Sequence, residues 1–225
     1  MKKLAKKYAA SLKLVEKGKK YSINEACELV KKTATAKFDE TVDVSFNLNI
    51  DPKQADQQLR GTISLPHGNG KTVRILAITD KAEEAKNAGA DFVGQQDMLD
   101  KIAKENWFDF DVIVATPNMM GLLGKMGRVL GPKGLMPNPK SGTVTMNIGA
   151  AIKEIKNGKI SYRNDKDGNL AINFGKASFS PEFLADNLKA IVETVNRIRP
   201  AAVKGTYILS ATISCTYGPA IKLAL

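Results

Sequence analysis

Residues 41–50 of the chain read TVDVSFNLNI, a stretch in which apolar and polar residues alternate without a break. Successive side chains of a β-strand point to opposite faces, so the alternation predicts a strand with one buried and one solvated face. One-sided burial is typical of antiparallel sheets. The residues of the apolar face are Val42, Val44, Phe46, Leu48 and Ile50. The residues of the polar face are Asp43, Ser45, Asn47 and Asn49.

Two segments on either side of this strand carry signals for the start of a helix. Ser22 and Glu25 have capping-box spacing before apolar residues at helical spacing, which predicts a helix to about residue 35. Ser180-Pro181-Glu182 combines an N-cap serine with proline at the first helical position, which predicts a helix to about residue 199. Helices and a half-buried strand indicate an α+β arrangement.

Further strands are expected near the C-terminal helix. Segments 159–164 and 169–174 flank the turn residues Asp165-Lys166-Asp167-Gly168, which predicts a β-hairpin. Residues 207–214 are predicted as the last strand. These strands share the half-buried character of residues 41–50, so both ends of the chain favour one domain.

The middle of the chain has a different character. It follows a turn-rich stretch, LPHGNG, at residues 65–70. Apolar strands at 73–78, 92–93 and 112–115 alternate with expected helices at 81–87 and 98–105, a pattern that indicates a parallel sheet covered on both faces. The sequence therefore predicts a discontinuous α+β domain, residues 1–67 and 159–225, with an α/β domain, residues 68–158, inserted through a two-stranded hinge.

The charge of the chain is uneven. Its 225 residues include 34 Lys and Arg and 23 Asp and Glu, a formal net charge of +11. Residues 68–158 hold 12 basic and 10 acidic residues, and the flanking segments hold 22 and 13. The excess charge therefore belongs mainly to the discontinuous domain and favours an anionic partner, although lysines that only keep the surface soluble are the alternative.

Few residues support catalysis, a cofactor or a metal. Gly68-Asn69-Gly70-Lys71-Thr72 ends like a phosphate loop, but Leu65 stands where the first glycine is required and a strand follows in place of a helix. The single histidine, His67, has no partner ligands at zinc spacing and is expected in a turn. We expect no enzyme activity, no cofactor and no metal. A nucleotide-dependent α/β enzyme remains the rival interpretation.

Cys27 and Cys215 lack metal-ligand spacing and are expected as buried thiols in a reducing compartment. Residues 1–20 are rich in lysine and lack the apolar stretch of a signal peptide, and no run of about 18 apolar residues occurs. The sequence therefore predicts a cytoplasmic protein without membrane contact. An organellar protein without its targeting peptide is not excluded.

The inserted region contains an unusual stretch, NMMGLLGKMGRVLGPKGLMPNPKSGTV, at residues 118–144. Dense glycine allows close approach of another backbone, and proline stiffens the chain. A long structural loop with a solvated basic face is the alternative. The positions that define this signature are Gly121, Gly124, Lys125, Gly127, Gly131, Pro132, Lys133, Gly134 and Pro137.

This stretch closely resembles the signature of the ribosomal protein L-one family. The resemblance extends over KFDETVDVSFNLNIDPKQADQQLRGTISLPHGNGK, ISYRNDKDGN, FGKASF and CTYGPAIKL, and so over nearly the whole chain. It implies a split α+β domain with an inserted Rossmann-like domain. It also implies a ribosomal protein, monomeric outside the ribosome, that binds large-subunit ribosomal RNA, assists release of exit-site tRNA and represses its own mRNA.

The resemblance also implies an RNA-binding site in which small hydroxyl residues suit 2′-hydroxyl groups, Phe38 a sugar or base, and Lys37 phosphate. The positions carried over from the family's motifs are Lys37, Phe38, Thr41, Ser210, Thr216, Tyr217 and Gly218. Charge and turn geometry indicate a further contact at Arg163, Asp165 and Lys166. Tyr217 departs from the family's usual Thr-Met-Gly, so its role transfers least. Structural alternatives are a core position for Phe38, an ordinary strand position for Thr41, a turn role for Gly218 and a solvated hairpin at residues 163–166.

Overall fold

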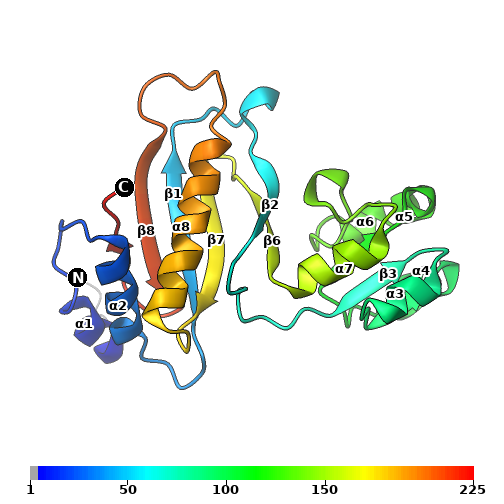
Figure 1. Ribbon diagram of the computed structural model, residues 1–225, viewed down its shortest axis with the longest axis horizontal. Coiled ribbons are helices and arrows are strands. Elements are labelled where there is room, and N and C mark those ends of the chain that lie inside the picture. The colour runs from blue at the N-terminus through cyan, green and yellow to red at the C-terminus, as the bar shows by residue number, and fades with distance from the viewer. Residues whose placement is uncertain (1–4) are drawn as a thin grey trace. The chain divides into compact units, whose positions relative to one another are not determined.

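A computed structural model describes residues 5–225 of the chain (Figure 1). The chain divides into two compact units. One is formed by residues 1–70 and 160–225 and is called the discontinuous unit below, and the other is formed by residues 71–159 and is called the inserted unit. Their antiparallel and parallel sheets confirm the predicted two-domain α+β fold class.

The discontinuous unit is built on a four-stranded sheet with the order β7-β1-β8-β9. Strand β1 (Thr41–Leu48) lies between β7 (Asn169–Lys176) and β8 (Ile208–Cys215) and is antiparallel to both. Its residues alternate between buried and accessible positions, as the sequence predicts. The short β9 (Ile221–Lys222) pairs with β8, so the expectation that residues 207–214 form the last strand is wrong.

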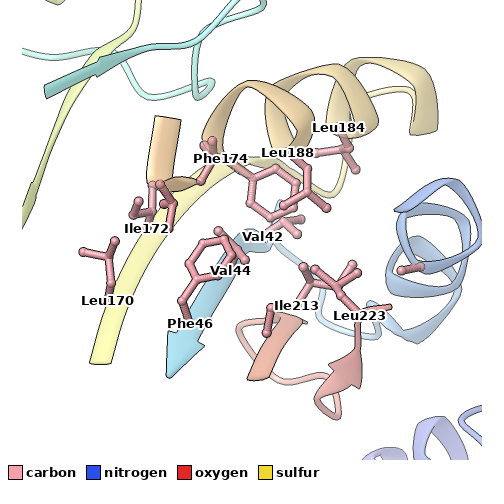
Figure 2. Packing of buried hydrophobic residues seen from close by; sticks show 14 of the residues in the cluster. Val42, Val44, Phe46, Leu170, Ile172, Phe174, Leu184, Leu188, Ile213 and Leu223 are labelled. Atoms are coloured by element: carbon pink, nitrogen blue, oxygen red, sulfur yellow. The ribbon is translucent and has the colours of Figure 1, made fainter. Parts of the chain in front are cut away.

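Two helices cover one face of this sheet (Figure 1). Helix α2 (Ile23–Thr33) begins at the predicted capping box, and α8 (Pro181–Arg197) begins at Ser180, whose hydroxyl accepts a hydrogen bond from the Phe183 N–H. Figure 2 shows side chains of β1, β7 and β8 meeting those of α8 in the core. Helix α8 is the longest described, and no helix among residues 5–225 is long and apolar enough to cross a membrane.

Helix α1 (Lys6–Leu12) was not predicted, because lysines interrupt its apolar pattern. It contacts α2, and the buried Ser11 hydroxyl donates to the Thr33 carbonyl over 3.2 Å. Part of the basic N-terminal segment is therefore ordered against the core. The first four residues of that segment lie outside the described residues.

The predicted hairpin at residues 159–174 is wrong in its pairing. Strand β6 (Lys159–Arg163) pairs with β2 (Arg60–Ser64) in a separate two-stranded sheet, whereas β7 pairs with β1. The tight turn itself forms, since the Asp165 N–H donates to the Asn169 carbonyl over 2.8 Å. Turn residues specify the local reversal of the chain, but they do not specify which strands pair beyond it. A short 3-10 helix, η1 (Ala55–Gln57), precedes β2.

The inserted unit contains a parallel sheet with the order β4-β3-β5. Its strands are β4 (Phe92–Gly94), β3 (Ile75–Ile78) and β5 (Val112–Ala115). Every residue of β3 is buried, because alternate side chains enter two separate apolar clusters on the two faces. This confirms the predicted burial of the sheet on both sides.

Helices cover both of these faces. The elements whose buried residues form one cluster with the sheet are α4 (Gln96–Glu105), η2 (Pro117–Met119), α5 (Met120–Lys125) and α6 (Gly127–Leu130). Those of the other cluster are α3 (Ala82–Asn87) and α7 (Ile148–Lys156). The sequence did not predict α7, and the glycine-rich stretch contains α5, α6 and η3 (Pro139–Ser141) and is not one long loop.

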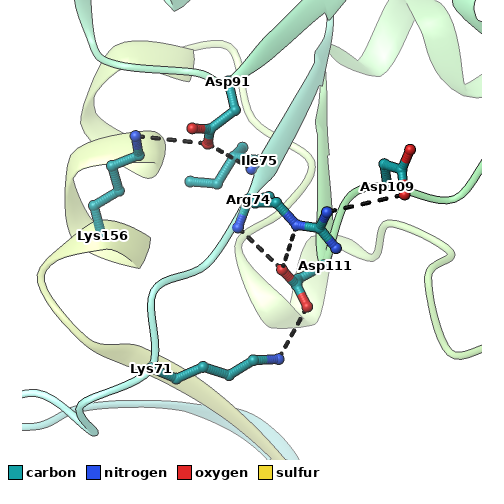
Figure 3. Close-up of polar contacts among 7 residues, drawn as sticks. All are labelled: Lys71, Arg74, Ile75, Asp91, Asp109, Asp111 and Lys156. Atoms are coloured by element: carbon teal, nitrogen blue, oxygen red, sulfur yellow. Dashed lines mark hydrogen bonds and ion pairs between the residues drawn. The ribbon is translucent and has the colours of Figure 1, made fainter.

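Two aspartates bond the backbone at the start of β3 in the parallel sheet (Figure 3). Asp91, before β4, accepts a hydrogen bond from the Ile75 N–H over 2.9 Å, and its own N–H donates to the Ile75 carbonyl. Asp111, before β5, makes the same pair of bonds with Arg74, at 3.1 and 2.8 Å. The Asp111 carboxylate also accepts from the Lys71 ammonium over 3.0 Å. Both neighbours of β3 are therefore anchored at the point where β3 begins.

Candidate nucleic-acid interface

The face of the four-stranded sheet opposite α2 and α8 carries small polar side chains. Along β1 and β8 the register places three such pairs opposite one another. These pairs are Asp43 with Ser214, Ser45 with Thr212, and Asn47 with Ser210. Their residues are exposed or half-buried. We call these six residues the polar ladder.

One end of the polar ladder is the junction of Thr41 and Thr216. The Thr41 N–H donates to Thr216 Oγ1 over 3.2 Å, and the Thr216 hydroxyl lies 3.5 Å from the Thr41 carbonyl oxygen, to which it donates. The Lys176 ammonium donates to Thr41 Oγ1 over 2.8 Å. The fold therefore brings together site residues that are 175 positions apart in the sequence.

An exposed aromatic pair lies beside this junction. Phe38 and Tyr217 have exposed fractions of 53% and 61%, and their ring centroids are 5.7 Å apart in an edge-on arrangement. The core interpretation of Phe38 is therefore wrong. Two aromatic rings held at the surface offer stacking positions for a base or a sugar. Lys37, next to Phe38, is also exposed.

Gly218 has the structural role that the turn alternative describes. Its N–H donates to the Cys215 carbonyl over 3.2 Å. A Cβ atom at this position would lie 3.3 Å from Thr33 Oγ1 and 3.3 Å from Cys215 Cβ, closer than is usual. Glycine therefore lets the turn after β8 approach α2 closely. This role is compatible with contact to RNA, because Gly218 is half-buried.

The other predicted site residues lie at the opposite end of the sheet. Asn47 is opposite Ser210 on β8 and opposite Asn169, the first residue of β7. The turn that carries Arg163, Asp165 and Lys166 leads into β7 at this end. At about 3.4 Å per residue, Ser210 and Thr216 are about 20 Å apart. The structure thus separates the site into two clusters, which the polar ladder connects. The alternation in residues 41–50 places the β1 members of the ladder on one face, but the sequence does not reveal their partners on β8.

The turn of residues 163–169 is organised by Asp165. Its carboxylate accepts hydrogen bonds from the Asp167 N–H, the Asn169 N–H and the Asn169 side-chain amide at 2.9, 2.7 and 3.0 Å. The Asn169 side-chain bond is the largest cause that lowers the pKa of Asp165. Arg163 and Lys166 are exposed on either side. Asp165 thus builds the turn, and the two cations are available to an anion.

Asp43 is the one acidic member of the polar ladder. Burial raises the pKa of its carboxyl group, and the positive charge of Lys176 partly opposes this effect. A partly desolvated carboxylate repels phosphate and accepts hydrogen bonds from amino or hydroxyl groups. Asp43 forms the rung next to the junction of Thr41 and Thr216, so its carboxylate disfavours phosphate at that rung, where Lys176 partly offsets its charge.

The glycine-rich signature lies in the inserted unit. Nothing among the described residues lies within 4 Å of a Cβ atom built at Gly121, Gly124 or Gly127, so these glycines border open space. Gly131 differs, because its Cβ would lie 2.6 Å from the Gly127 carbonyl oxygen. Gly134 has a positive φ of 71°, a conformation that favours glycine.

The remaining signature residues have mixed surroundings. The Lys133 ammonium lies 4.1 Å from the centroid of the Phe108 ring. Lys125 and Pro132 are exposed, whereas Pro137 is buried. Among the signature glycines, only Gly131 allows close approach of another backbone atom of the chain. Gly121 and Gly124 are exposed, so no side chain covers the backbone there.

The residues considered for nucleotide binding, metal binding or thiol chemistry make contacts that explain them as structural residues. The His67 ring stacks on Phe183 with centroids 4.1 Å apart, and Lys71 precedes β3, not a helix. Among residues 5–225, no three His, Cys, Asp or Glu side chains are placed to hold a metal ion. Burial raises the pKa of the Cys27 thiol to about 12 and that of Cys215 to about 11. Both cysteines are buried free thiols, as predicted.

Comparisons with known proteins agree on one family. A family model described as the ribosomal protein L1p/L10e family matches residues 30–219. The large ribosomal subunit protein uL1 of Mesoplasma florum is 55% identical over 226 aligned residues, which cover all of both chains. The protein of the same name from Mycoplasma capricolum is 54% identical over 224 residues, 99% of each chain.

Proposed function

Because this chain belongs to the ribosomal protein L1p/L10e family, we propose that it is a structural protein of the large ribosomal subunit whose discontinuous unit binds large-subunit ribosomal RNA. The observation that carries the proposal is the junction of Thr41 and Thr216. It joins the two sequence segments expected to contact RNA and continues into the polar ladder. The names of the two relatives support the assignment to the large subunit.

The chemistry of the polar ladder suits RNA better than DNA. An A-form RNA helix has a wide, shallow minor groove that displays 2′-hydroxyl groups and base edges. Short hydroxyl and amide side chains on a sheet can donate to and accept from those groups at close range. Ser45, Thr212 and Asn47 provide such side chains within one surface.

Cations at the two ends of the ladder support the orientation of the bound RNA. Lys37 and Lys176 lie near the junction of Thr41 and Thr216, and Arg163 and Lys166 lie near the turn at the other end. Phosphate contacts position a nucleic acid, whereas polar groups that reach base edges and sugars provide specificity. We assign positioning to these four cations and recognition to the ladder and the aromatic pair.

We propose that the protein is not an enzyme. The nucleotide-dependent alternative rests on Gly70-Lys71-Thr72, and there the Lys71 ammonium bonds the Asp111 carboxylate and a strand follows. A phosphate loop requires a helix N-terminus at this point. Calorimetric titration of the full chain with ATP and with GTP should detect no binding, and saturable binding of either nucleotide would restore the enzyme alternative.

The resemblance to the family extends the proposal to exit-site tRNA and to the protein's own mRNA. Repression of its mRNA would use the same surface as ribosomal RNA, so the two RNAs should compete for the protein. An excess of large-subunit ribosomal RNA should displace a transcript of the leader of its own mRNA in a filter-binding assay. Simultaneous binding of both RNAs would contradict a shared surface.

The assignment to the large subunit is tested by co-sedimentation. The purified chain should sediment with large ribosomal subunits that lack the family protein, and the bound fraction should fall as salt rises because phosphate contacts release counterions. Crosslinking should join the bound RNA to peptides that contain residues 37–41 or 210–218. Absence of association at low salt would contradict the proposed function.

A further inference from the structure

Glu40 is a buried carboxylate directly before β1. Its exposed fraction is 1%, and no ion pair among the described residues includes it. A buried charge is costly unless hydrogen bonds satisfy it. Three backbone N–H groups, each donating to one of its two oxygens, provide this here.

The two oxygens of Glu40 serve two different segments. Oε1 accepts from the N–H groups of Thr35 and Ala36 at 2.8 and 2.7 Å. Oε2 accepts from the Tyr217 N–H at 2.9 Å, across 177 positions of sequence. One carboxylate therefore ties the segment that leads into Lys37 and Phe38 to the turn after β8.

The position of these bonds matters for the aromatic pair. Phe38 and Tyr217 are both exposed, so burial of their rings in the core does not hold them. Their backbones are held near each other by Glu40 on one side and by the junction of Thr41 and Thr216 on the other. Ordering side chains and loops on binding costs free energy, and a site that is ordered beforehand avoids this cost.

We propose that Glu40 is a positioning residue for RNA binding, which holds Phe38 and Tyr217 in their edge-on arrangement before RNA arrives. The inference rests on the proposed RNA-binding function. Glu40 does not touch the RNA, because its side chain is buried. Sequence reasoning missed it, since a glutamate at a strand entry is ordinarily interpreted as a solvated residue.

The substitution Glu40→Gln tests the proposal with little change in shape. An amide keeps one oxygen acceptor and places an NH2 group where the other oxygen was, so one of the two segments loses its acceptor. Loss of a negative charge alone should strengthen binding to a polyanion. The proposal expects the opposite, a loss of affinity of about tenfold or more, which is typical of a broken hydrogen bond to a charged group.

Glu193→Gln is the matched control, because it removes the same charge from an exposed position on α8. Affinities of the full chain are measured for a transcript of large-subunit ribosomal RNA, with small-subunit ribosomal RNA as the comparison. We expect the slope of log affinity against log salt to stay unchanged in Glu40→Gln, because no cation is removed. Equal affinity of folded Glu40→Gln and wild type would overturn the positioning role.

Hydrogen exchange of the wild-type protein provides a second measurement that does not depend on folding of the variant. The amide protons of Thr35, Ala36 and Tyr217 should exchange slowly in the free protein, because all three are bonded before RNA binds. Exchange at the rate of an unstructured peptide, slowed only when RNA is added, would show that RNA orders the site and would refute the proposal. Wild type that does not prefer large-subunit RNA would instead contradict the proposed function itself.

Discussion

Phe38 and Phe46 are eight positions apart, and they differ in exposure to solvent. Phe46 is on the buried face of β1 with an exposed fraction of 1%, whereas more than half of Phe38 is exposed. Phe38 lies against the exposed ring of Tyr217, and contiguous exposed apolar surface is typical of interaction sites, which supports the proposed contact with RNA. The role of each phenylalanine therefore follows from its surroundings and not from its residue type.

Alanine substitution of Phe38 and of Phe46 should change the stability of the protein by different amounts. Phe46→Ala should lower the free energy of unfolding by about 3–5 kcal/mol because it leaves a cavity, and Phe38→Ala should lower it by less than about 1 kcal/mol. Urea denaturation of the full-length variants followed by circular dichroism measures both. A loss of several kcal/mol in Phe38→Ala would return Phe38 to a core role.

Cys27 and Cys215 permit a prediction on pH. Their thiol pKa values, raised to about 12 and about 11 by burial, leave almost no thiolate near neutral pH. The thiolate is the reactive form, so neither cysteine should react with iodoacetamide at pH 8 in the folded protein. Mass spectrometry should find both cysteines modified after addition of urea. Rapid labelling of the native protein at pH 8 would contradict their burial.

At the scale of elements, the sequence predicts best those strands and helices that bury one face, or that begin at a clear capping residue. The alternation of residues 41–50 predicts β1, and the capping residues predict the starts of α2 and α8. Pairing is less visible, because the turn at residues 165–168 is local and β6 finds its partner in β2, about 100 positions earlier in the chain. Helices α5 and α6 were missed because glycine, which disfavours helices, is frequent there.

Single carboxylates bond the backbone at the start of β3 in the inserted sheet. Asp111 accepts from the Arg74 backbone, whereas Asp109, two positions earlier, is 69% exposed and lies 4.0 Å from the Arg74 guanidinium. The Asp109 carboxylate accepts a hydrogen bond from the Trp107 indole N–H, which the amide oxygen of Asn can also accept. Asp111→Asn should lower the free energy of unfolding by about 1–3 kcal/mol, and the matched control Asp109→Asn by less than about 0.5 kcal/mol. Urea denaturation measures the difference, and equal effects of both substitutions would rule out this stabilising role of Asp111.

The same carboxylate predicts a dependence of stability on pH. The hydrogen bond from the Arg74 N–H is the largest cause that lowers the pKa of Asp111 below its usual value. A lowered folded-state pKa contributes stability that is present above the unfolded pKa, about 3.9, and is lost as pH falls through the folded pKa. Thermal unfolding between pH 6 and pH 2 should therefore show a smaller loss of stability in Asp111→Asn than in wild type. Identical pH profiles would contradict this contribution.

At the scale of the whole molecule, the sequence identifies the residues of the proposed site, and the structure shows how they are arranged. The residues of both clusters could be named from the family resemblance, and the net charge of +11 indicates the class of partner. The junction of Thr41 and Thr216, the polar ladder and the bonds of Glu40 depend on strand register across the sheet. The ladder pairs, the junction and the bond from Glu40 to the Tyr217 N–H join residues more than 160 positions apart, which local patterns do not determine, so the sequence alone did not reveal them.

We propose that a largely uncharged surface on the discontinuous unit recognises large-subunit ribosomal RNA, while lysine and arginine supply attraction. The most direct test measures the affinity of the full chain and of the Phe38→Ala/Thr216→Ala double variant for large-subunit ribosomal RNA across a salt series. We expect the double variant to lose about 1–3 kcal/mol of binding free energy for each contact, with the salt slope unchanged. Wild-type affinity in a folded double variant would contradict it.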